Sequence, residues 1–349
     1  MAQLPAARPA PGFTLVELLV VVAVLSAVSL FAFGIVTEDK AQIRHDDTRH
    51  RLLQLRRAIL GDSGPTTATA ASGFVADNGD LPADIGTLLN AGTLLGKAVL
   101  TPLFDPAPGS DCSNNGGELA SPFGDPADSG AQLLKGHHGD YLGGLGFNGR
   151  FRDGWGNVGQ VDDAVNFGWA VVPGGATLSL SSLGADNAAG GTDHYASDTT
   201  QTIAANDWLL PLEGWSVTVV NRTGSDLVPQ NLALSLLAFR NGNGGQWRRH
   251  STAIANVCLD GDADGQCQGA VASDRQTFSF AAHCKAGDAG SPASIIPQGR
   301  HLLLLTAHNT GELWQAGSDA PFVHGGRRVL AQVDAVAGRP LPSMLLEIR

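Results

Sequence analysis

A membrane-length apolar run near the start of the chain constrains its fold more than any other feature. From Phe13 to Val36 the only charged side chain is Glu17. As a helix with a rise of about 1.5 Å per residue, this run covers the roughly 30 Å hydrocarbon core of a bilayer. We therefore predict a transmembrane helix over residues 13–36. A carboxylate inside such a helix is costly, so we expect Glu17 to have a function and a positively charged partner.

The residues around the start of this run form a processing signal. Residues 1–12 are a polar leader with three prolines, which cannot join the helix. The chain resembles the class III signal of type IV pilins and type II secretion pseudopilins at Gly12, Phe13, Thr14, Leu15 and Glu17. This resemblance implies that a prepilin peptidase cuts after Gly12 and methylates the amine of Phe13. It also implies that Glu17 pairs with the N-terminal amine of a neighbouring subunit, and that other pilins and an inner-membrane assembly platform are partners.

The helix is predicted to continue past the apolar run to about Leu60. The next stretch is charged, but Ala41, Thr48, Leu52, Leu55 and Ile59 repeat at helical spacing. Gly61, Gly64 and Pro65 then end the pattern. A helix over 13–60, about 72 Å long, has half its length for a membrane or filament core and half for a globular head. That is the backbone shape of a pilin.

Residues 61–173 are predicted to form a pilin-like head on this helix. Residues 73–89 resemble major-pseudopilin-like proteins, in which a short helix follows a Leu-Pro turn. Residues 151–157 resemble the Asp-x-Trp-Gly-Asn turn of the same proteins, and 167–173 the strand after it. In this turn we expect Trp155 to be a core aromatic. Its neighbours Gly154 and Gly156 permit positive φ there.

The remainder of the chain favours short strands. Residues 174–206, rich in Gly, Ala and Asp, are predicted to be a linker or surface loop. A period of two then marks strands at 215–221, 232–239, 276–282, 301–308, 329–336 and 343–348. The predicted fold class is therefore α+β, with a long spine helix, a β head and a strand-rich region over 207–349. The pattern leaves open whether this region is a sandwich or an extension of the head's sheet.

Composition favours an exported structural protein. Charged residues are 16% of the chain and Gly is 45 of 349 residues, against averages of about 25% and about 7%. The net charge of −11 disfavours a nucleic-acid partner. The chain contains no nucleophile-elbow, zinc-protease or P-loop motif, so we expect no catalytic residue and no enzyme activity.

The cysteines of an exported chain point to disulfides. Their number is even, and they are Cys112, Cys258, Cys267 and Cys284. Pairing of Cys258 with Cys267 and pairing of Cys267 with Cys284 are both compatible with the sequence.

An acidic stretch at 258–269 resembles the first half of a calcium loop. The pattern D-x-D-x-D-G is formed by Asp260, Asp262, Asp264 and Gly265. Val271 occupies the position of the expected glutamate, so the site would be completed by Asp274 or by the backbone carbonyls of Gln266 or Gln268. The alternative is a solvated acidic hairpin tip without an ion.

These patterns together predict a minor pilin or pseudopilin. Its precursor would cross the bacterial inner membrane once and, after cleavage, join a periplasmic or cell-surface filament of a type II secretion system or a type IV pilus. The alternative is a pilus-anchored adhesin or receptor that binds through residues 207–349. A DNA-uptake pilin is less compatible with the acidic charge.

Overall fold

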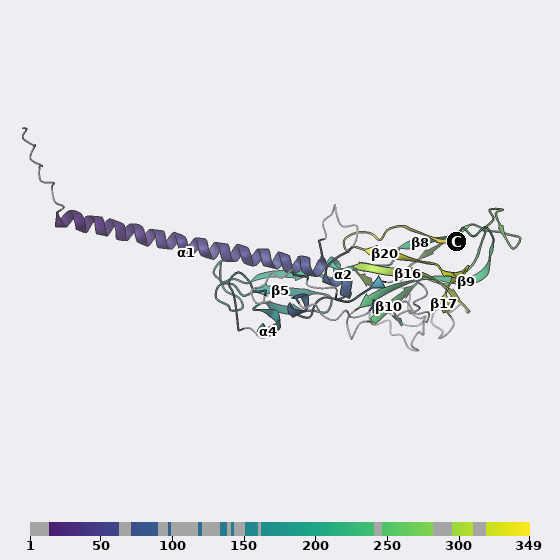
Figure 1. Ribbon diagram of the computed structural model, residues 1–349, viewed down its shortest axis with the longest axis horizontal. Helices are drawn as coiled ribbons and strands as arrows, with labels where there is room; N and C mark the ends of the chain where they lie inside the picture. Colours follow the sequence, from purple (N-terminus) through teal and green to yellow (C-terminus); the bar gives the residue numbers. More distant parts are fainter. Residues whose placement is uncertain are drawn as a thin grey trace, which may run out of the picture.

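The computed structural model describes residues 14–62, 71–89, 97–98, 118–120, 133–137, 141–142, 151–159, 162–240, 246–281, 295–309 and 319–349. Side chains of residues 30–38 lie outside this description. Gly12, Phe13, Cys112 and Cys284, which the sequence marks as candidate site residues, also lie outside it. Within the described part, helix α1 projects from one end of the molecule and the β-sheets gather at the other (Figure 1).

Helix α1 spans Leu15–Leu60, which confirms the predicted spine and its last residue. Thr14 caps its first turn, and the Thr14 and Glu17 side chains each bind the other's backbone N–H in a capping box. At the other end Gly61 leaves the helix with φ 78°, and its N–H donates to the carbonyl of Arg57. No helix among the described residues combines the length and the apolar character needed to cross a membrane.

The C-terminal half of α1 packs on the first of two hydrophobic cores. Its predicted stripe is buried at Thr48, Leu52, Leu55 and Ile59. Around it lie α2 (Phe74–Asn78), α3 (Gly86–Leu89), α4 (Asp163–Asn166) and a sheet of order β4-β5-β6, with β4 at Ala170–Pro173, β5 at Leu178–Ser182 and β6 at Thr199–Ile203. The short helix predicted after the Leu-Pro turn is α3, and the strand predicted over 167–173 is β4.

The prediction of a linker or loop over 174–206 is wrong, because β5 and β6 lie inside it. Leu178, Leu180 and Ile203 are almost fully buried in the first core. These three are the only large apolar residues of β5 and β6. Because so few apolar residues alternate here, and a polar loop at 183–198 separates the two strands, the sequence shows no clear period of two. Only that loop matches the expectation.

The prediction for Trp155 is also wrong. Trp155 is half-buried, and Trp169 fills the core instead, with its indole N–H donating to the carbonyl of Phe151 at 2.7 Å. Gly156 has the predicted positive φ, at 76°. Gly154 is needed for close approach, because a Cβ there would lie 2.2 Å from the carbonyl oxygen of Arg44 on α1.

The C-terminal region is a sandwich of two sheets. The larger has the order β17-β16-β9-β10-β2, with β11 also on β9 and β20 also on β16, and the smaller has the order β14-β8-β21. Their bounds are β2 Glu118–Ala120, β8 Ser216–Asn221, β9 Leu227–Arg240, β10 Gln246–Ser251, β11 Ala255–Leu259, β14 Arg275–Ser279, β16 Gly299–His308, β17 Asp319–Pro321, β20 Leu330–Ala335 and β21 Met344–Ile348. All six predicted strands are confirmed, and apolar side chains of both sheets share the second core.

Short elements complete the described structure. They are β1 Lys97–Ala98, β3 Leu133–Leu134, the 3₁₀ turn Ala205–Asp207, β7 Leu209–Pro211, β12 Gln266–Cys267, β13 Ala270–Val271, β15 Ile295–Pro297, β18 Val323–His324 and β19 Arg327–Arg328. Of these, β7 and β15 pair antiparallel. In the chain β7 follows the strands of the first core, and β15 leads into β16 of the sandwich, so this pairing links the two parts.

Buried side chains join the two cores directly. Gln298 donates from its amide Nε2 to the carbonyl of Leu60, the last residue of α1, at 2.7 Å. Arg240 lies over the ring of Trp208 with its guanidinium carbon 5.3 Å from the ring centre, and it also pairs with Asp80 at 3.0 Å. The sandwich is therefore docked on the end of the spine helix by specific contacts.

Two buried basic groups lie at this junction. Lys135 donates to the carbonyl of Ala76 at 2.7 Å, and burial lowers the pKa of its amine to about 8. His301 donates from Nε2 to the carbonyl of Pro297 at 2.8 Å. Burial, and then the neighbouring Lys135, lower the pKa of His301 to about 3.

We predict that His301→Gln reduces the loss of stability in acid. Because the pKa of His301 is about 3 when folded and 6.5 ordinarily, the unfolded chain binds more protons between these values. Stability therefore falls as the pH drops through this window. At two pH units below the ordinary value the effect is on the order of 2–3 kcal/mol. Thermal unfolding between pH 7 and pH 4.5 measures it, with exposed His50→Gln as the control. Equal pH slopes in wild type and His301→Gln would contradict the assignment.

Candidate functional site

The N-terminal part of α1 presents apolar side chains on every side. Ten large aliphatic residues between Leu15 and Val28 are 46% to 76% exposed. Five of them, from Leu18 to Val22, are consecutive, and five consecutive residues already point to every side of a helix with 3.6 residues per turn. A helix that is hydrophobic all round is found buried in apolar surroundings. This half of α1 therefore requires cover from outside the subunit.

One carboxylate stands at the start of this apolar segment. Oε2 of Glu17 accepts hydrogen bonds from the backbone N–H and the hydroxyl of Thr14, each at 2.9 Å. Thr14 directly follows Phe13, the residue expected to carry the mature amine. Oε1 of Glu17 accepts no hydrogen bond from the described residues, so the carboxylate can hold the helix cap and pair with an ammonium group together. The spacing Thr14-x-x-Glu17 is itself a capping-box pattern, so this cap is predictable from the sequence.

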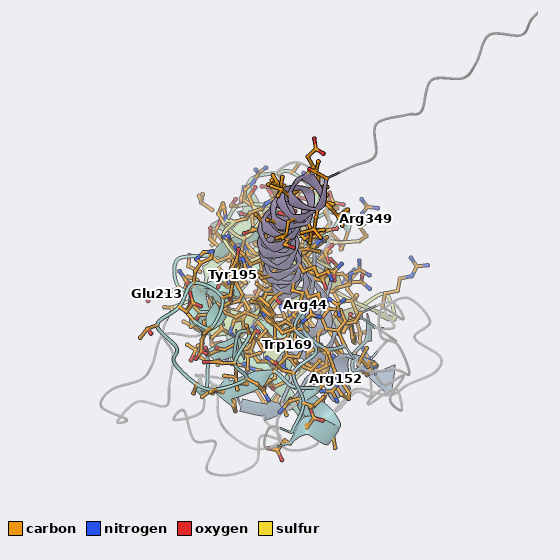
Figure 2. The ribbon with its side chains drawn as sticks, turned by 90° about the vertical axis from the view of Figure 1, so that its left-hand side faces the viewer. Arg44, Arg152, Trp169, Tyr195, Glu213 and Arg349 are labelled. Carbon is orange, nitrogen blue, oxygen red and sulfur yellow. A yellow bond between two sulfur atoms is a disulfide. The ribbon has the colours of Figure 1, made fainter. Side chains whose placement is uncertain are left out.

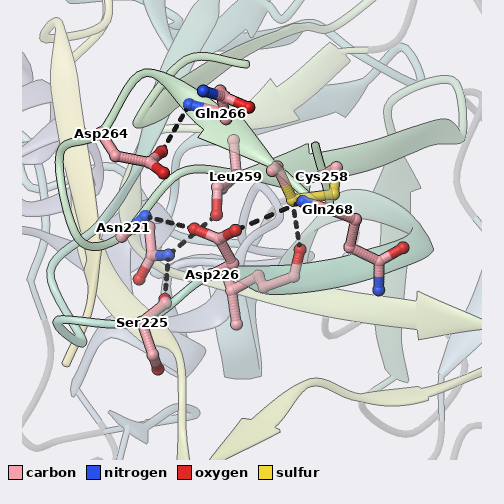
Figure 3. Close-up of a disulfide and its surroundings, with 11 residues drawn as sticks. Asn221, Ser225, Asp226, Cys258, Leu259, Asp264, Gln266 and Gln268 are labelled. Atoms are coloured by element: carbon pink, nitrogen blue, oxygen red, sulfur yellow. Dashed lines mark hydrogen bonds between the residues drawn. A yellow bond between two sulfur atoms is a disulfide. The ribbon is translucent and has the colours of Figure 1, made fainter. Parts of the chain in front are cut away.

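A second candidate site is the acidic loop that follows β11. Cys258 and Cys267 form a disulfide across this loop (Figure 3). Carboxylate oxygens of Asp226, Asp260 and Asp262 lie within 4.8 Å of one another. Oxygen donors at such spacing are the type that Ca²⁺ binds.

The membership of this cluster differs from the predicted set. Asp264 accepts from the N–H of Gln266 at 2.7 Å and is not part of the three-carboxylate group. Asp274 accepts from Arg275 at 2.9 Å and lies 3.6 Å from Arg222. The hydrogen bond from Arg275 is the main cause that lowers the pKa of Asp274.

The third carboxylate of the cluster belongs to Asp226, where the sequence pattern predicts Asp274. Its Oδ1 accepts from the N–H of Gly261 at 3.3 Å and its Oδ2 from the N–H of Gln268 at 3.4 Å (Figure 3). It lies just before β9, and the pairing of β9 with β11 brings it to the loop. Nothing local in the sequence links these distant segments, so pattern reasoning missed it.

The loop also binds itself. Asp260 is only 4% exposed, and its two oxygens accept from the N–H groups of Ala263 and Gly265, both at 2.8 Å. Oδ1 of Asp262 accepts from the N–H of Asp264 at 3.2 Å. These backbone hydrogen bonds hold the carboxylates in place. The arrangement is compatible with a cation site and also with an acidic turn that binds no ion.

Comparison with known proteins bears on the N-terminal site. Residues 8–33 match the family model of the prokaryotic N-terminal methylation motif. The chain carries a prepilin-type signal. This is the signal of type IV pilins and pseudopilins, and the match confirms the resemblance found in the sequence. No curated protein and no solved structure matches the chain.

The prepilin-type signal agrees with the geometry of the first turns of α1. The matched range contains the capping pair Thr14 and Glu17 and the exposed apolar residues up to Val28. The signal implies processing by prepilin peptidase and assembly with other pilins. A segment that is retained after processing and has no apolar cover of its own is suited to such assembly.

Proposed function

We propose that the protein is a minor pilin or pseudopilin that assembles into a type II secretion pseudopilus or a type IV pilus. The observation that carries this proposal is the prepilin-type signal on a helix whose apolar half is exposed on all sides. Before assembly, the precursor is held in the inner membrane by residues 13–36. After assembly, neighbouring helices replace the lipid around the same side chains.

The mechanism is polymerisation driven by apolar burial and set in register by one charge pair. Fully burying a Val or Leu side chain contributes about 1.5–3 kcal/mol, and α1 offers ten such residues. Apolar burial alone does not determine how far one helix is shifted along its neighbour. Glu17 supplies direction by pairing with the amine of Phe13 in the adjacent subunit, in surroundings of low dielectric where an unmatched charge is costly.

The head gives the filament subunit its particular role. A structural subunit needs no catalytic group, and we propose none. The two-sheet C-terminal region, docked on the spine, supports an accompanying role as an adhesin or receptor at the filament surface. The acidic chain disfavours DNA uptake.

We predict that Gly12→Asp leaves the precursor uncleaved, because the peptidase acts after a glycine at this position. Mass spectrometry of the wild type should find a chain beginning with N-methylated Phe13. Ala10→Asp adds the same charge to the leader and should still be processed. A mature wild-type protein that retains Met1 would overturn the proposal.

We predict that Glu17→Gln lowers incorporation into filaments at least tenfold while membrane insertion is unchanged. Gln keeps an oxygen for the N–H of Thr14 and removes only the charge, and a buried charge left without its partner costs roughly 3–5 kcal/mol. Sedimented or sheared filaments give the incorporated fraction. Glu213→Gln, at an exposed carboxylate of the head (Figure 2), is the control. Assembly of Glu17→Gln at wild-type levels would show that register is set elsewhere.

We also propose that the acidic loop binds Ca²⁺ through Asp226, Asp260 and Asp262. The support is their mutual distance within 4.8 Å and the disulfide that holds the ends of the loop together. Three neighbouring carboxylates repel one another, and a divalent cation removes that repulsion. Binding to the folded form alone then raises stability.

We predict that calcium raises the melting temperature of the full mature chain in detergent relative to a chelator. A site with a Kd of about 10 µM adds about 2.7 kcal/mol at a hundredfold excess of free calcium. Asp262→Asn should abolish the gain, because the amide keeps the bond to the N–H of Asp264 but loses the charge. Asp264→Asn, next to the cluster, should retain it. An unchanged melting temperature in wild type would identify the loop as an acidic turn only.

A further inference from the structure

Loop 183–198 is held against α1 at the point where the helix enters the head. The hydroxyl of Tyr195 (Figure 2) donates to Oε1 of Gln42 at 3.1 Å. The ring of Tyr195 also contacts the edge of Trp155, with ring centres 6.0 Å apart. These contacts bring two histidines together from distant parts of the chain. The ring centres of His45 on α1 and His194 in the loop lie 5.2 Å apart, with the ring planes tilted by 38°.

This separation fits two imidazoles bound to one tetrahedral metal ion. A Zn–N bond is about 2.0–2.1 Å, and the ring centre lies about 1.1 Å beyond the nitrogen. Two rings that meet at the tetrahedral angle therefore have centres about 5.2 Å apart around zinc. The value observed for His45 and His194 is the same.

The surroundings of His45 also favour coordination. Its Nδ1 is buried and makes no hydrogen bond among the described residues, and a buried polar atom without a partner calls for an explanation. The nearest carboxylate oxygen is Oδ1 of Asp46, at 3.8 Å. Asp46 is held by the same network, because Nε2 of Gln42 donates to its Oδ2 at 2.9 Å. Its Oδ1 is left on the side of His45.

The side chains of His194 and Asp46 are accessible to an ion from solvent. His194 is exposed, and the side chain of Asp46 is 61% exposed. Among the described residues only Asp226, Asp260 and Asp262 form a three-donor group that is already within ligand spacing. Asp46 Oδ1 is already 3.8 Å from Nδ1 of His45, so the distances that must shorten are those to His194. The exposed side chains of His194 and Asp46 therefore have to rotate until all three groups face one ion, and water completes the shell.

We propose that His45 and His194 bind one Zn²⁺ ion, with Asp46 as the third ligand. Imidazole nitrogen with a carboxylate oxygen is a ligand set that zinc and its transition-metal neighbours prefer. The ion ties loop 183–198 to α1 across the base of the head. It thereby rigidifies the part of the head nearest to the assembly segment. Because the imidazoles must be neutral, acid releases the metal.

The test is zinc binding to the untagged, full mature chain in detergent micelles, measured by competition with a chromophoric chelator. We expect one equivalent of zinc to bind. His45→Gln and His194→Gln should each weaken binding at least tenfold. His50→Gln, at an exposed histidine on the same helix, and Asp262→Asn, in the acidic loop, should bind as wild type does.

A spectroscopic readout separates coordination from a structural effect. Cu²⁺ bound at this site should show two nitrogen ligands by electron paramagnetic resonance, and one in His194→Gln. His194 is exposed, so its replacement should leave the metal-free melting temperature unchanged even if the His45 variant folds poorly. Wild-type affinity in His194→Gln, or binding only at millimolar zinc, would overturn the proposal.

Discussion

The apolar half of α1 is the constraint on which the rest of the structure depends. It presents ten large aliphatic side chains on every side, and none of the described elements covers them. The head must leave this segment free, so it packs only on the C-terminal half of the helix. Such exposure would be a liability in a monomer. The proposed function gives it a use, because there the same surface contacts lipid first and other subunits afterwards. The prepilin-type signal retains the segment in the mature chain.

A head held at one end of a long helix must be fixed by contacts over a short length. Two separate segments, residues 152–154 and the sandwich, provide them. The hydroxyl of Thr48 accepts from the N–H of Gly154 at 3.0 Å, and Arg51 donates to the carbonyl of Arg152 at 2.7 Å. Gln298 reaches the last carbonyl of α1 from the sandwich. The bond from Gln298 is buried, and removing one partner of a buried hydrogen bond costs about 1–3 kcal/mol. This contact therefore matters most to the orientation of the head.

Local patterns predicted the elements with strong periodicity. The spine helix and six strands were found because their apolar residues repeat at 3.6 or 2 within one window. Strands β5 and β6 were missed because they contain few large apolar residues. Trp155 and Trp169 both follow glycine-rich turns, and only the packed structure shows that Trp169 occupies the core. Asp226 could not be found at all, since its place in the cluster is created by the pairing of β9 with β11.

The junction between the two cores uses one kind of contact repeatedly. Lys135, Arg240 and Gln298 donate to carbonyls of Ala76, Gly79 and Leu60, which belong to the last turns or caps of α1 and α2. Terminal helix carbonyls lack partners within the helix, and cations near them are favoured by the helix dipole. A donor that binds the end of a helix fixes the position of its own segment along the helix axis. An apolar contact does not, because it has no preferred direction. Burying Lys135 lowers the pKa of its amine to about 8, so this arrangement costs stability. In return it specifies how the sandwich is aligned on the spine.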